Sequence, residues 1–460
     1  MTVNAAQPAI IFAPATPAGQ SGVAVYRISG QNLNCVFEHL GINQRPKPRE
    51  AALRRLRKGT EGELIDEALV LYFPAPHSFT GEEVIELQTH GGSAIRQTLL
   101  NWLSQLEGCR LAEAGEFSRR AFTHGKMDLL QAEGIADLIA AETSMQQQQA
   151  LRQMGGALSE QYEQMRADIL RALALLEAYL DFPDEEIPEE TLTQTSQLID
   201  RLIGTIEALL TEPPSGEMIR EGMTIAIIGP PNAGKSSLLN RLAGREAAIV
   251  TDIAGTTRDR VEVHLNLHGY FVRLIDTAGL RETHDTIEAE GVRRARESAA
   301  QAQLTLMVLD IVSDTELSAE SLAYLPENAI LVINKCDQFN NDAAREHKRK
   351  ALPENLAALP TLWVSARDDI GIDTLIERIT TEISQRVEAC PSPLLTRTRH
   401  RQALYEAYEH LNQLAQQSAL PLELYAEELR LAARAIGKIT GHIDVDQLLD
   451  VIFREFCIGK

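Results

Sequence analysis

The sequence predicts a multidomain protein: an α+β N-terminal domain (residues 1–122), then an all-α helical domain (123–220 and 386–460) interrupted by an inserted α/β domain (221–385). Three observations predict this. Residues 1–122 mix short β-branched runs with helical periodicity. Residues 123–220 and 386–460 show helical periodicity alone. Residues 221–385 alternate fully apolar strand patterns with helices, which is typical of a parallel sheet.

Composition and charge indicate a globular protein with sizeable hydrophobic cores and a strongly acidic balance. The 460 residues are 44% apolar, enough for real cores, and the net charge of −21 opposes nonspecific attraction to nucleic acid, so RNA contact would need local basic patches. Five cysteines lie scattered without a C-x-x-C pair, which argues against disulfides or zinc knuckles and favours a reducing compartment. The first cation is Arg27 and no apolar run reaches about 18 residues. We therefore expect a cytoplasmic protein.

The first domain carries strand patterns at residues 22–28, 68–73 and 84–87 and a helical pattern at 93–106. Residues 45–58 hold a basic run for which a solvated loop and helix face is favoured over phosphate contact. It consists of Arg45, Lys47, Arg49, Arg54, Arg55, Arg57 and Lys58. Three segments rich in Gly and charge (78–83, 90–92 and 114–122) fit a set of ligand-binding loops. His90 alone reads better as a turn or core histidine than as a ligand.

The helical domain is predicted from apolar spacing. Residues 151–180 repeat apolar side chains every three or four positions, which predicts one long amphipathic helix whose stripe is core. The Pro-bounded acidic segment 181–188 reads as a linker rather than an acid–base pair. Helical spacing resumes at 198–210 and 404–414, and the two parts are expected to pack together, with the α/β domain inserted near Gly222 and Val387. The small basic cluster at 397–401 is expected to be solvated surface.

Residues 229–237 match the phosphate-binding loop pattern G-x-x-x-x-G-K-[ST]. The loop follows an apolar strand (224–228) and opens a helix. Gly229 and Gly234 let the backbone wrap around phosphate, Lys235 adds a cation, and the hydroxyl of Ser236 is suited to Mg²⁺. The segment therefore predicts a nucleotide phosphate site.

Three further motifs follow strands in order. Asp276-Thr277-Ala278-Gly279 can reach Mg²⁺ and the γ-phosphate. Asn334-Lys335-Cys336-Asp337 ends in a carboxylate whose two oxygens match the N1–H and N2–H₂ donors of guanine, which adenine lacks. Ser365-Ala366-Arg367 supplies a loop beneath the base. The nucleotide is therefore predicted to be GTP.

Hydrolysis needs a switch loop and a group that orients water. Residues 251–259 are polar and contain Gly255, as a first switch loop does, and one of their threonines is expected to ligate Mg²⁺. Leu280 stands where many small GTPases place the water-orienting glutamine, and leucine cannot hydrogen-bond water. The residues themselves leave five candidates open: Arg281, Glu282, Asp285, Glu288 and Glu290.

Together with the flanking domains and the final Phe-Cys-Ile-Gly-Lys (456–460), these motifs resemble the MnmE family, also called TrmE, of tRNA-modification GTPases, essentially along the whole chain. The resemblance implies a homodimer with a tetrahydrofolate-binding N-terminal domain. It also implies that the protein works with MnmG, which uses FAD and NADH, in a heterotetramer or larger complex. The implied product carries an aminomethyl or carboxymethylaminomethyl group at C5 of the tRNA wobble uridine.

The resemblance also implies roles for individual residues. Asn232 would bind K⁺ together with Thr251, Ile253 and Thr256, Thr257 would ligate Mg²⁺ beside Ser236, and Glu288 would orient water. The predicted catalytic residues are Glu288, Asn232, Lys235 and Cys457. The folate site would hold Arg27, Glu86, Lys126 and Lys460, with the thiol of Cys457 near it. The predicted GTP contacts are Asn232, Ala233, Gly234, Lys235, Ser236, Ser237, Thr251, Asp252, Ile253, Ala254, Gly255, Thr256, Thr257, Asp276, Thr277, Ala278, Gly279, Asn334, Lys335, Asp337, Ser365, Ala366 and Arg367.

Two other functions stay open from the sequence. One is a GTP-dependent assembly switch, for example in ribosome maturation, against which the folate-like loops and the Cys-Ile-Gly-Lys end argue. The other is a folate-dependent aminomethyltransferase that acts on a protein or metabolite and is regulated by its GTPase. Without the resemblance, the residues at 456–460 read equally well as a frayed apolar helix end or as a thiol and lysine delivered to a site.

Overall fold

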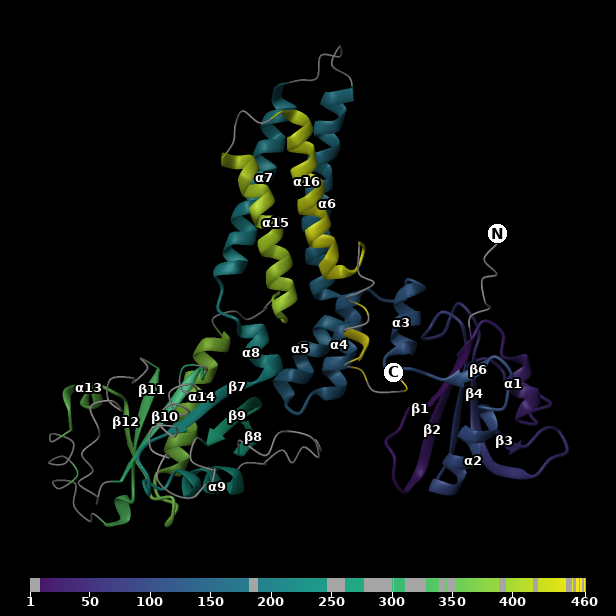
Figure 1. Cartoon of the computed structure of the whole chain (residues 1–460), viewed down its shortest axis with the longest axis horizontal. Helices are drawn as coiled ribbons and strands as arrows, with labels where there is room; N and C mark the ends of the chain where they lie inside the picture. The colour runs from purple at the N-terminus through teal and green to yellow at the C-terminus, as the bar shows by residue number, and fades with distance from the viewer. Residues whose placement is uncertain are drawn as a thin grey trace, which may run out of the picture. The chain divides into compact units, whose positions relative to one another are not determined.

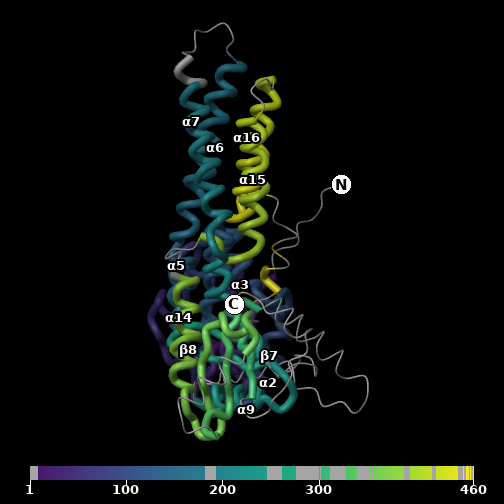
Figure 2. The backbone as a smooth tube through the Cα atoms, turned by 90° about the vertical axis from the view of Figure 1, so that its left-hand side faces the viewer, coloured from purple at the N-terminus to yellow at the C-terminus, as the bar shows by residue number. Residues whose placement is uncertain are grey.

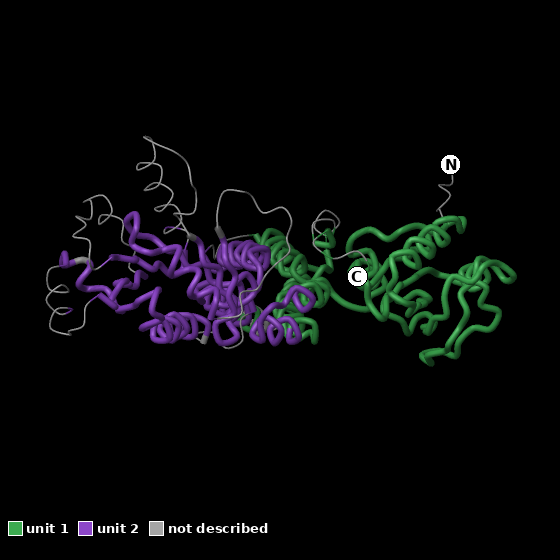
Figure 3. Tube along the Cα trace, turned by 90° about the horizontal axis from the view of Figure 1, so that it is seen from below, with its two compact units in different colours: residues 1–136, 153–195, 417–460 green, residues 137–152, 196–416 purple. Residues whose placement is uncertain are grey.

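The structure is a computed structural model that describes residues 9–181, 189–245, 261–276, 300, 302–310, 328–338, 345, 352–388, 394–416, 421–443, 449, 452–454, 456 and 459. The chain divides into two compact units (Figure 3). The first comprises residues 1–136, 153–195 and 417–460, and the second comprises 137–152 and 196–416. Each unit is discontinuous in sequence. The domain boundaries given above remain predictions.

The first unit contains a six-stranded sheet of order β3-β4-β5-β2-β1-β6 (Figure 1). Its neighbours are antiparallel except for the parallel pair β1 and β6. The strands are β1 (Ile10–Pro14), β2 (Ser21–Gly30), β3 (Ala52–Arg57), β4 (Leu64–Phe73), β5 (Glu83–Gly91) and β6 (Cys109–Leu111). Helices α1 (Asn34–His39) and α2 (Ser93–Leu103) belong to the same region. The predicted strands at 22–28, 68–73 and 84–87 are thereby confirmed, and the helix predicted at 93–106 is confirmed as far as Leu103, where it ends.

The alternation of side chains along β2 places its residues on two faces of the sheet. Tyr26 and Ile28 are fully buried in the core that α1 and α2 cover. Arg27 points to the opposite face, where Ile11, Ala13 and Phe117 form a smaller core. A cation is thus held beside apolar rings on a rigid central strand.

The basic run at 45–58 was predicted to lie on a loop and a helix face, and the helical part of that prediction is wrong. Its second half is strand β3, which pairs with β4 along the edge of the sheet. Leu56 is buried while Leu53 and Arg55 are exposed, so the pattern has the two-residue period of a strand. The alternation is visible in the sequence, but the many arginines obscure it.

The helices of the first unit include α3 (Glu116–Thr123), most of α4 (Leu129–Ala140), α6 (Ala157–Asp181) and α16 (Leu422–Thr440). Helices α6 and α16 lie side by side along their length (Figures 1 and 2). The single long helix predicted from residue 151 is wrong in one respect. Helix α5 (Ser144–Met154) ends before Gly155-Gly156, and α6 begins afterwards. Gly156 has φ +87°, a conformation that continues no right-handed helix.

The second unit contains a six-stranded sheet of order β12-β11-β10-β7-β9-β8, parallel except for β8. Its strands are β7 (Met223–Ile228), β8 (Val261–Leu267), β9 (Tyr270–Asp276), β10 (Leu304–Asp310), β11 (Ala329–Asn334) and β12 (Thr361–Trp363). The helices described in this unit are α8 (Ser215–Glu221), α9 (Lys235–Arg245), α13 (Glu354–Ala357), α14 (Ile372–Glu388), α15 (Thr398–Gln416), most of α5 and most of α7 (Glu189–Thr211).

Strand β7 explains why this sheet needs cover on both faces. All six of its residues are buried. Ile225 and Ile227 join a core that contains Leu238 of α9 and Leu375 of α14, whereas Ala226 and Ile228 join a second core that contains Leu356 of α13. The uninterrupted apolar run in the sequence therefore reflects burial on two sides. None of the helices in the described ranges has both the length and the apolar character needed to cross a membrane.

Candidate functional site

The predicted nucleotide motifs gather at one edge of the second sheet. Strands β7, β9, β10, β11 and β12 are parallel, so their carboxyl ends meet there. Gly229 follows β7, Asp276 ends β9, and Asn334 ends β11. Ser365 follows β12 by one residue, and Asp310 ends β10. Segments separated by more than 100 residues in sequence are thus brought together, as the order of motifs predicts.

The phosphate loop joins β7 to α9 and depends on two glycines. Gly229 has φ +146° and Gly234 has φ +91°. A Cβ atom at Gly229 would lie 2.1 Å from the Val308 carbonyl oxygen, and one at Gly234 would lie 2.2 Å from Nδ2 of Asn334. Neither position admits a side chain. Asn232 also has a positive φ of +62°, which asparagine tolerates better than most residues.

The loop holds its lysine close to its own backbone. Lys235 is 7% exposed, and its Nζ donates to the carbonyl oxygens of Gly229 and Pro230, each at 2.8 Å. Ser236 lies exposed in the first turn of α9, where unpaired backbone N–H groups favour anions. A bound phosphate would offer Lys235 charged oxygens in place of the two carbonyls.

Asn334 connects the phosphate loop to the base loop. Its side chain is almost fully buried, its Nδ2 donates to the Ala233 carbonyl at 2.9 Å, and its Oδ1 accepts from the Ala366 amide at 3.1 Å. Beside it, Nζ of Lys335 donates to the Asn232 carbonyl at 3.1 Å and to the Asp310 carboxylate at 2.7 Å. Asp310 is not among the residues predicted from the sequence, where its only signal is its place at the end of an apolar strand.

Hydrogen bonds within the protein fix the shape of the base loop. Ser365 is fully buried and exchanges two backbone hydrogen bonds with Ile370. The guanidinium of Arg241 donates to the carbonyls of Ala366 and Arg367, both at 2.9 Å. Asp337 is partly buried in a short 3₁₀ turn (Cys336–Gln338), and its carboxylate makes no hydrogen bond within the part of the chain that the structure describes. Both of its oxygens are therefore available to a ligand.

Several predicted site residues lie outside the described ranges: Thr251, Asp252, Ile253, Ala254, Gly255, Thr256, Thr257, Thr277, Ala278, Gly279, Glu288, Cys457 and Lys460. Asp276 is described through its backbone, which pairs with Ile227 of β7. The structure thus brings together the phosphate loop, Asn334, Lys335, Asp337 and the 365–367 loop.

A second cluster lies in the first unit. Arg27 and Glu86 face each other across β2 and β5, with Nε and Nη2 of Arg27 at 2.9 and 2.8 Å from Oε1 of Glu86. The guanidinium carbon lies 5.3 Å from the centroid of the Phe79 ring and 5.8 Å from that of Phe117. Both charged side chains are largely buried, so their charges are weakly screened. Such a pair, flanked by rings, can present a donor and an acceptor to a flat heterocycle.

The other predicted folate residues lie around this cluster. Nη1 of Arg27 donates to the Gly459 carbonyl at 3.4 Å, and a Cβ at Gly459 would lie 2.3 Å from the Pro14 carbonyl oxygen. Lys126 donates from Nζ to the Pro76 carbonyl at 3.0 Å, in the loop that also carries Phe79. Gly459 is therefore a neighbour of Arg27, although the two residues lie 432 positions apart in sequence.

Part of the loop set at 78–83 serves the fold rather than a ligand. Ser29 binds Thr80 and the carboxylate of Glu82, both at 2.7 Å, and Arg120 pairs with Glu82 at 2.9 Å. Thr80 and Glu82 are buried within this network. His90 is exposed, with Nδ1 at 2.8 Å from Asp66, so it is not a core histidine. The density of polar residues that predicts a ligand here is satisfied largely by internal hydrogen bonds.

Comparison with known proteins decides the family. The sequence model of the MnmE helical domain matches residues 129–457, and that of the GTP-binding protein TrmE N-terminus matches residues 10–126. The chain belongs to the MnmE family. Curated relatives named tRNA modification GTPase MnmE are 48% identical in Paramagnetospirillum magneticum and Rhodospirillum rubrum and 46% identical in Caulobacter vibrioides. Each alignment covers 98% of this chain and 99% of the relative.

Among solved structures, the chain is similar to the G domain of the T. maritima FeoB iron transporter, with 26% identity over 35% of this chain and 98% of that one and a TM-score of 0.26. Membership of the MnmE family confirms the predicted family and the predicted multidomain fold class. The enzyme class that the MnmE relatives share, GTP hydrolase, is the class predicted from the motifs.

Proposed function

We propose that the protein hydrolyses GTP in order to modify tRNA. The proposed product carries an aminomethyl or carboxymethylaminomethyl group at C5 of the wobble uridine, made together with an MnmG-type partner that uses FAD and NADH. GTP hydrolysis is supported mainly by the contact between the phosphate loop and the base loop. Asn334 hydrogen-bonds to both Ala233 and Ala366, while the carboxylate of Asp337 stays available to a base. The tRNA part is supported by the name shared by the relatives.

Guanine selection follows from hydrogen-bond chemistry. The Asp337 carboxylate accepts from N1–H and N2–H₂ of guanine, and an adenine would leave it partly desolvated without partners. The phosphates lie on the loop 229–236, where Lys235 exchanges its two carbonyl partners for phosphate oxygens. Because Asn334 fixes both loops, base and phosphate contacts hold a constant separation.

Two cations belong to the proposed site. Ser236 and Thr257 would hold Mg²⁺, and Asn232 would hold K⁺ with Thr251, Ile253 and Thr256. The described residues fit: Ser236 is exposed at the start of α9, and the side chain of Asn232 makes no hydrogen bond within the described ranges. A monovalent cation there supplies positive charge of the kind that an arginine finger gives. Glu288 is proposed to orient the attacking water, since Leu280 cannot.

The one-carbon unit is proposed to arrive on a tetrahydrofolate derivative bound in the first unit. Glu86, which pairs with Arg27, would accept hydrogen bonds from the N–H groups of a pteridine ring, and Arg27 would donate to its oxygen and nitrogen acceptors. Lys126 and Lys460 would supply charge for the carboxylates of the folate tail. Cys457 is the remaining residue of the proposed folate site, where it would supply a thiol. We also propose that the protein acts in the cytoplasm as a homodimer whose paired nucleotide domains close on GTP.

The test is nucleoside mass spectrometry of tRNA from cells that lack this protein. We expect the C5-modified wobble uridine to disappear, and to return with the parent but not with Lys235→Ala, which should slow GTP hydrolysis by roughly 100-fold or more. Lys47→Ala is the control, since this lysine is exposed and pairs only weakly with Glu50 at 3.8 Å. A nucleoside profile that does not change on deletion would refute the tRNA function.

A further inference from the structure

The carboxylate of Asp137 binds both the segment that leads into the nucleotide-binding sheet and the segment that leaves it. Asp137 lies in the last turn of α4. Its Oδ1 accepts from Nε of Arg220 at 3.1 Å and from Nη2 of Arg397 at 2.8 Å. Arg220 is in α8, just before β7, and Arg397 follows α14, the last helix of the sheet region. The segments that lead into and out of the nucleotide-binding region are therefore fixed to the same oxygen atom.

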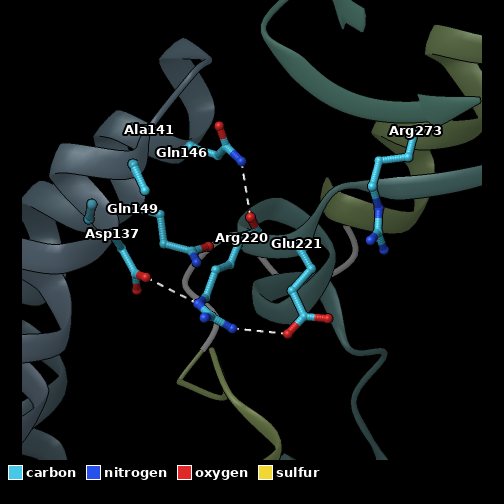
Figure 4. A pocket seen from close by; sticks show the side chains of 9 residues that line it. Asp137, Ala141, Gln146, Gln149, Arg220, Glu221 and Arg273 are labelled. Atoms are coloured by element: carbon cyan, nitrogen blue, oxygen red, sulfur yellow. Dashed lines mark hydrogen bonds and ion pairs between the residues drawn. The ribbon is translucent and has the colours of Figure 1, made fainter. Parts of the chain in front are cut away.

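Further hydrogen bonds surround this junction (Figure 4). From α5, Nε2 of Gln146 donates to the Arg220 carbonyl and Nε2 of Gln149 donates to the Gly216 carbonyl, both at 3.0 Å. The hydroxyl of Ser215 donates to the Arg386 carbonyl at 2.9 Å and so joins α8 to α14. The side chains of Asp137 and Arg397 are only 16% and 11% exposed, so water screens their ion pair weakly. The prediction that the cluster at 397–401 is solvated surface is therefore wrong for Arg397, and also for the fully buried His400.

The junction borders a cavity of about 270 Å³. Its walls include Asp137, Gln149, Arg220, Glu221 and Arg273 (Figure 4). Two buried polar atoms there, Nε of Arg273 and Oε1 of Gln149, have no hydrogen-bond partner among the residues that the structure describes. Arg220 already has a second acceptor at hand, because its Nη1 donates to Glu221 at 2.9 Å. The junction thus has both the space and the unpaired groups that a second arrangement needs.

Two strands connect this junction to the nucleotide site. Strand β7 (Met223–Ile228) is separated from α8 by Gly222 alone and ends directly before Gly229 of the phosphate loop. Strand β9 contains Arg273 in its middle and Asp276 at its carboxyl end. The strands are paired, with Thr224 opposite Arg273 and Ile227 opposite Asp276, and Nη2 of Arg273 also donates to Oγ1 of Thr224 at 3.1 Å. The segments that carry Arg220 and Arg273 are therefore directly connected to the phosphate loop and to Asp276.

We propose that the junction of Asp137, Arg220 and Arg397 transmits the nucleotide state from the phosphate loop to the helical segments. It is closed in one nucleotide state and opens in the other, with Arg220 released from Asp137 toward Glu221. Helix α4 carries the change onward, because it runs without a break from Leu129 in the first unit to Ala140 in the second. Asp137 acts as a positioning residue, and this role rests on the GTPase function proposed above.

The test compares the full-length parent with Asp137→Asn, which removes the charge and keeps the shape, and with Asp137→Glu, which keeps the charge. Amide hydrogen exchange of residues 137–152 is measured with GDP and with a non-hydrolysable GTP analogue. We expect the parent's exchange rates to differ about tenfold between the two nucleotides, and the Asn variant's by less than about twofold. Asp137→Glu should restore most of the difference. Glu177→Gln is the control, because it breaks a half-exposed ion pair to Arg430 at 2.6 Å on helices away from the junction.

Activity is measured on the same proteins. Asp137→Asn should lower the rate of tRNA modification about tenfold while GTP affinity and hydrolysis stay within about threefold of the parent. Equal exchange in the two nucleotide states of the parent would overturn the proposal, as would equal losses of hydrolysis and modification together with a lower melting temperature. A parent that binds GTP but modifies no tRNA would refute the proposed function, whereas the exchange measurement would still decide the junction.

Discussion

At the scale of single residues, Asp337 gives a sharp prediction for base selection. Asparagine keeps one acceptor and adds a donor, which matches the N1–H and O2 of xanthine and mismatches guanine. Asp337→Asn should weaken GTP binding roughly 100-fold, the loss expected for a charge-assisted pair of hydrogen bonds of about 3 kcal/mol, and should favour xanthosine triphosphate. Titration of the two nucleotides by calorimetry measures the ratio. Asp368→Asn is the control, and an unchanged ratio in Asp337→Asn would show that this carboxylate does not contact the base.

Single residues also show where sequence reasoning stops. The motif around Asn334 is visible from sequence because its residues are contiguous and follow an apolar strand. Its bonds to Ala233 and Ala366 join positions 101 and 32 residues away, so no local pattern contains them. The same holds for Asp137, which stands in an ordinary amphipathic helix. Its importance comes from two arginines, 83 and 260 positions along the chain.

At the scale of elements, two glycines in the helical region are expected to respond oppositely to alanine. Gly156 separates α5 from α6 with φ +87°, where an L side chain is strained, so Gly156→Ala should destabilise by about 1–2 kcal/mol. Gly204 lies in the middle of α7 with nothing within 4 Å of an added Cβ, so Gly204→Ala should stabilise by up to about 1 kcal/mol. Urea unfolding followed by circular dichroism measures both changes. Equal effects would mean that the turn at Gly156 is not required.

Elements were predicted best where one interaction dominates. The strand Met223–Ile228 has a clear sequence pattern because both of its faces are buried. The helix Ser93–Leu103 has a clear pattern because one of its faces is buried. The break at Gly155-Gly156 was missed because the apolar period continues through it. Apolar spacing is the stronger signal in a search for helices, yet a pair of glycines allows the chain to turn at little cost. In β3, a high density of arginine conceals the alternation that packing against β4 imposes.

At the scale of the whole molecule, the chain leaves and re-enters each unit. Residues 137–152 belong to the second unit although they lie between segments of the first, and residues 417–460 return to the first. The sequence predicts an insertion, because helical periodicity is interrupted by strands. It does not predict that α4 and α7 each divide between units, since this depends on which side chains they meet, such as Arg220 and Arg397 for Asp137. Local patterns fix the elements, and long-range contacts fix their grouping.

The two units should respond separately to their two proposed ligands. A ligand at about 100 times its Kd stabilises the unit that binds it by about 2.7 kcal/mol, or about 5–10 °C for a region of this size. In differential scanning calorimetry, a non-hydrolysable GTP analogue should raise the transition of the second unit, and a reduced folate should raise that of the first. Lys235→Ala should lose only the first shift and Arg27→Ala only the second, since Lys235 lies on the phosphate loop and Arg27 beside Glu86. If folate raises neither transition while the GTP analogue raises its own, the proposed folate site is wrong and the nucleotide site stands.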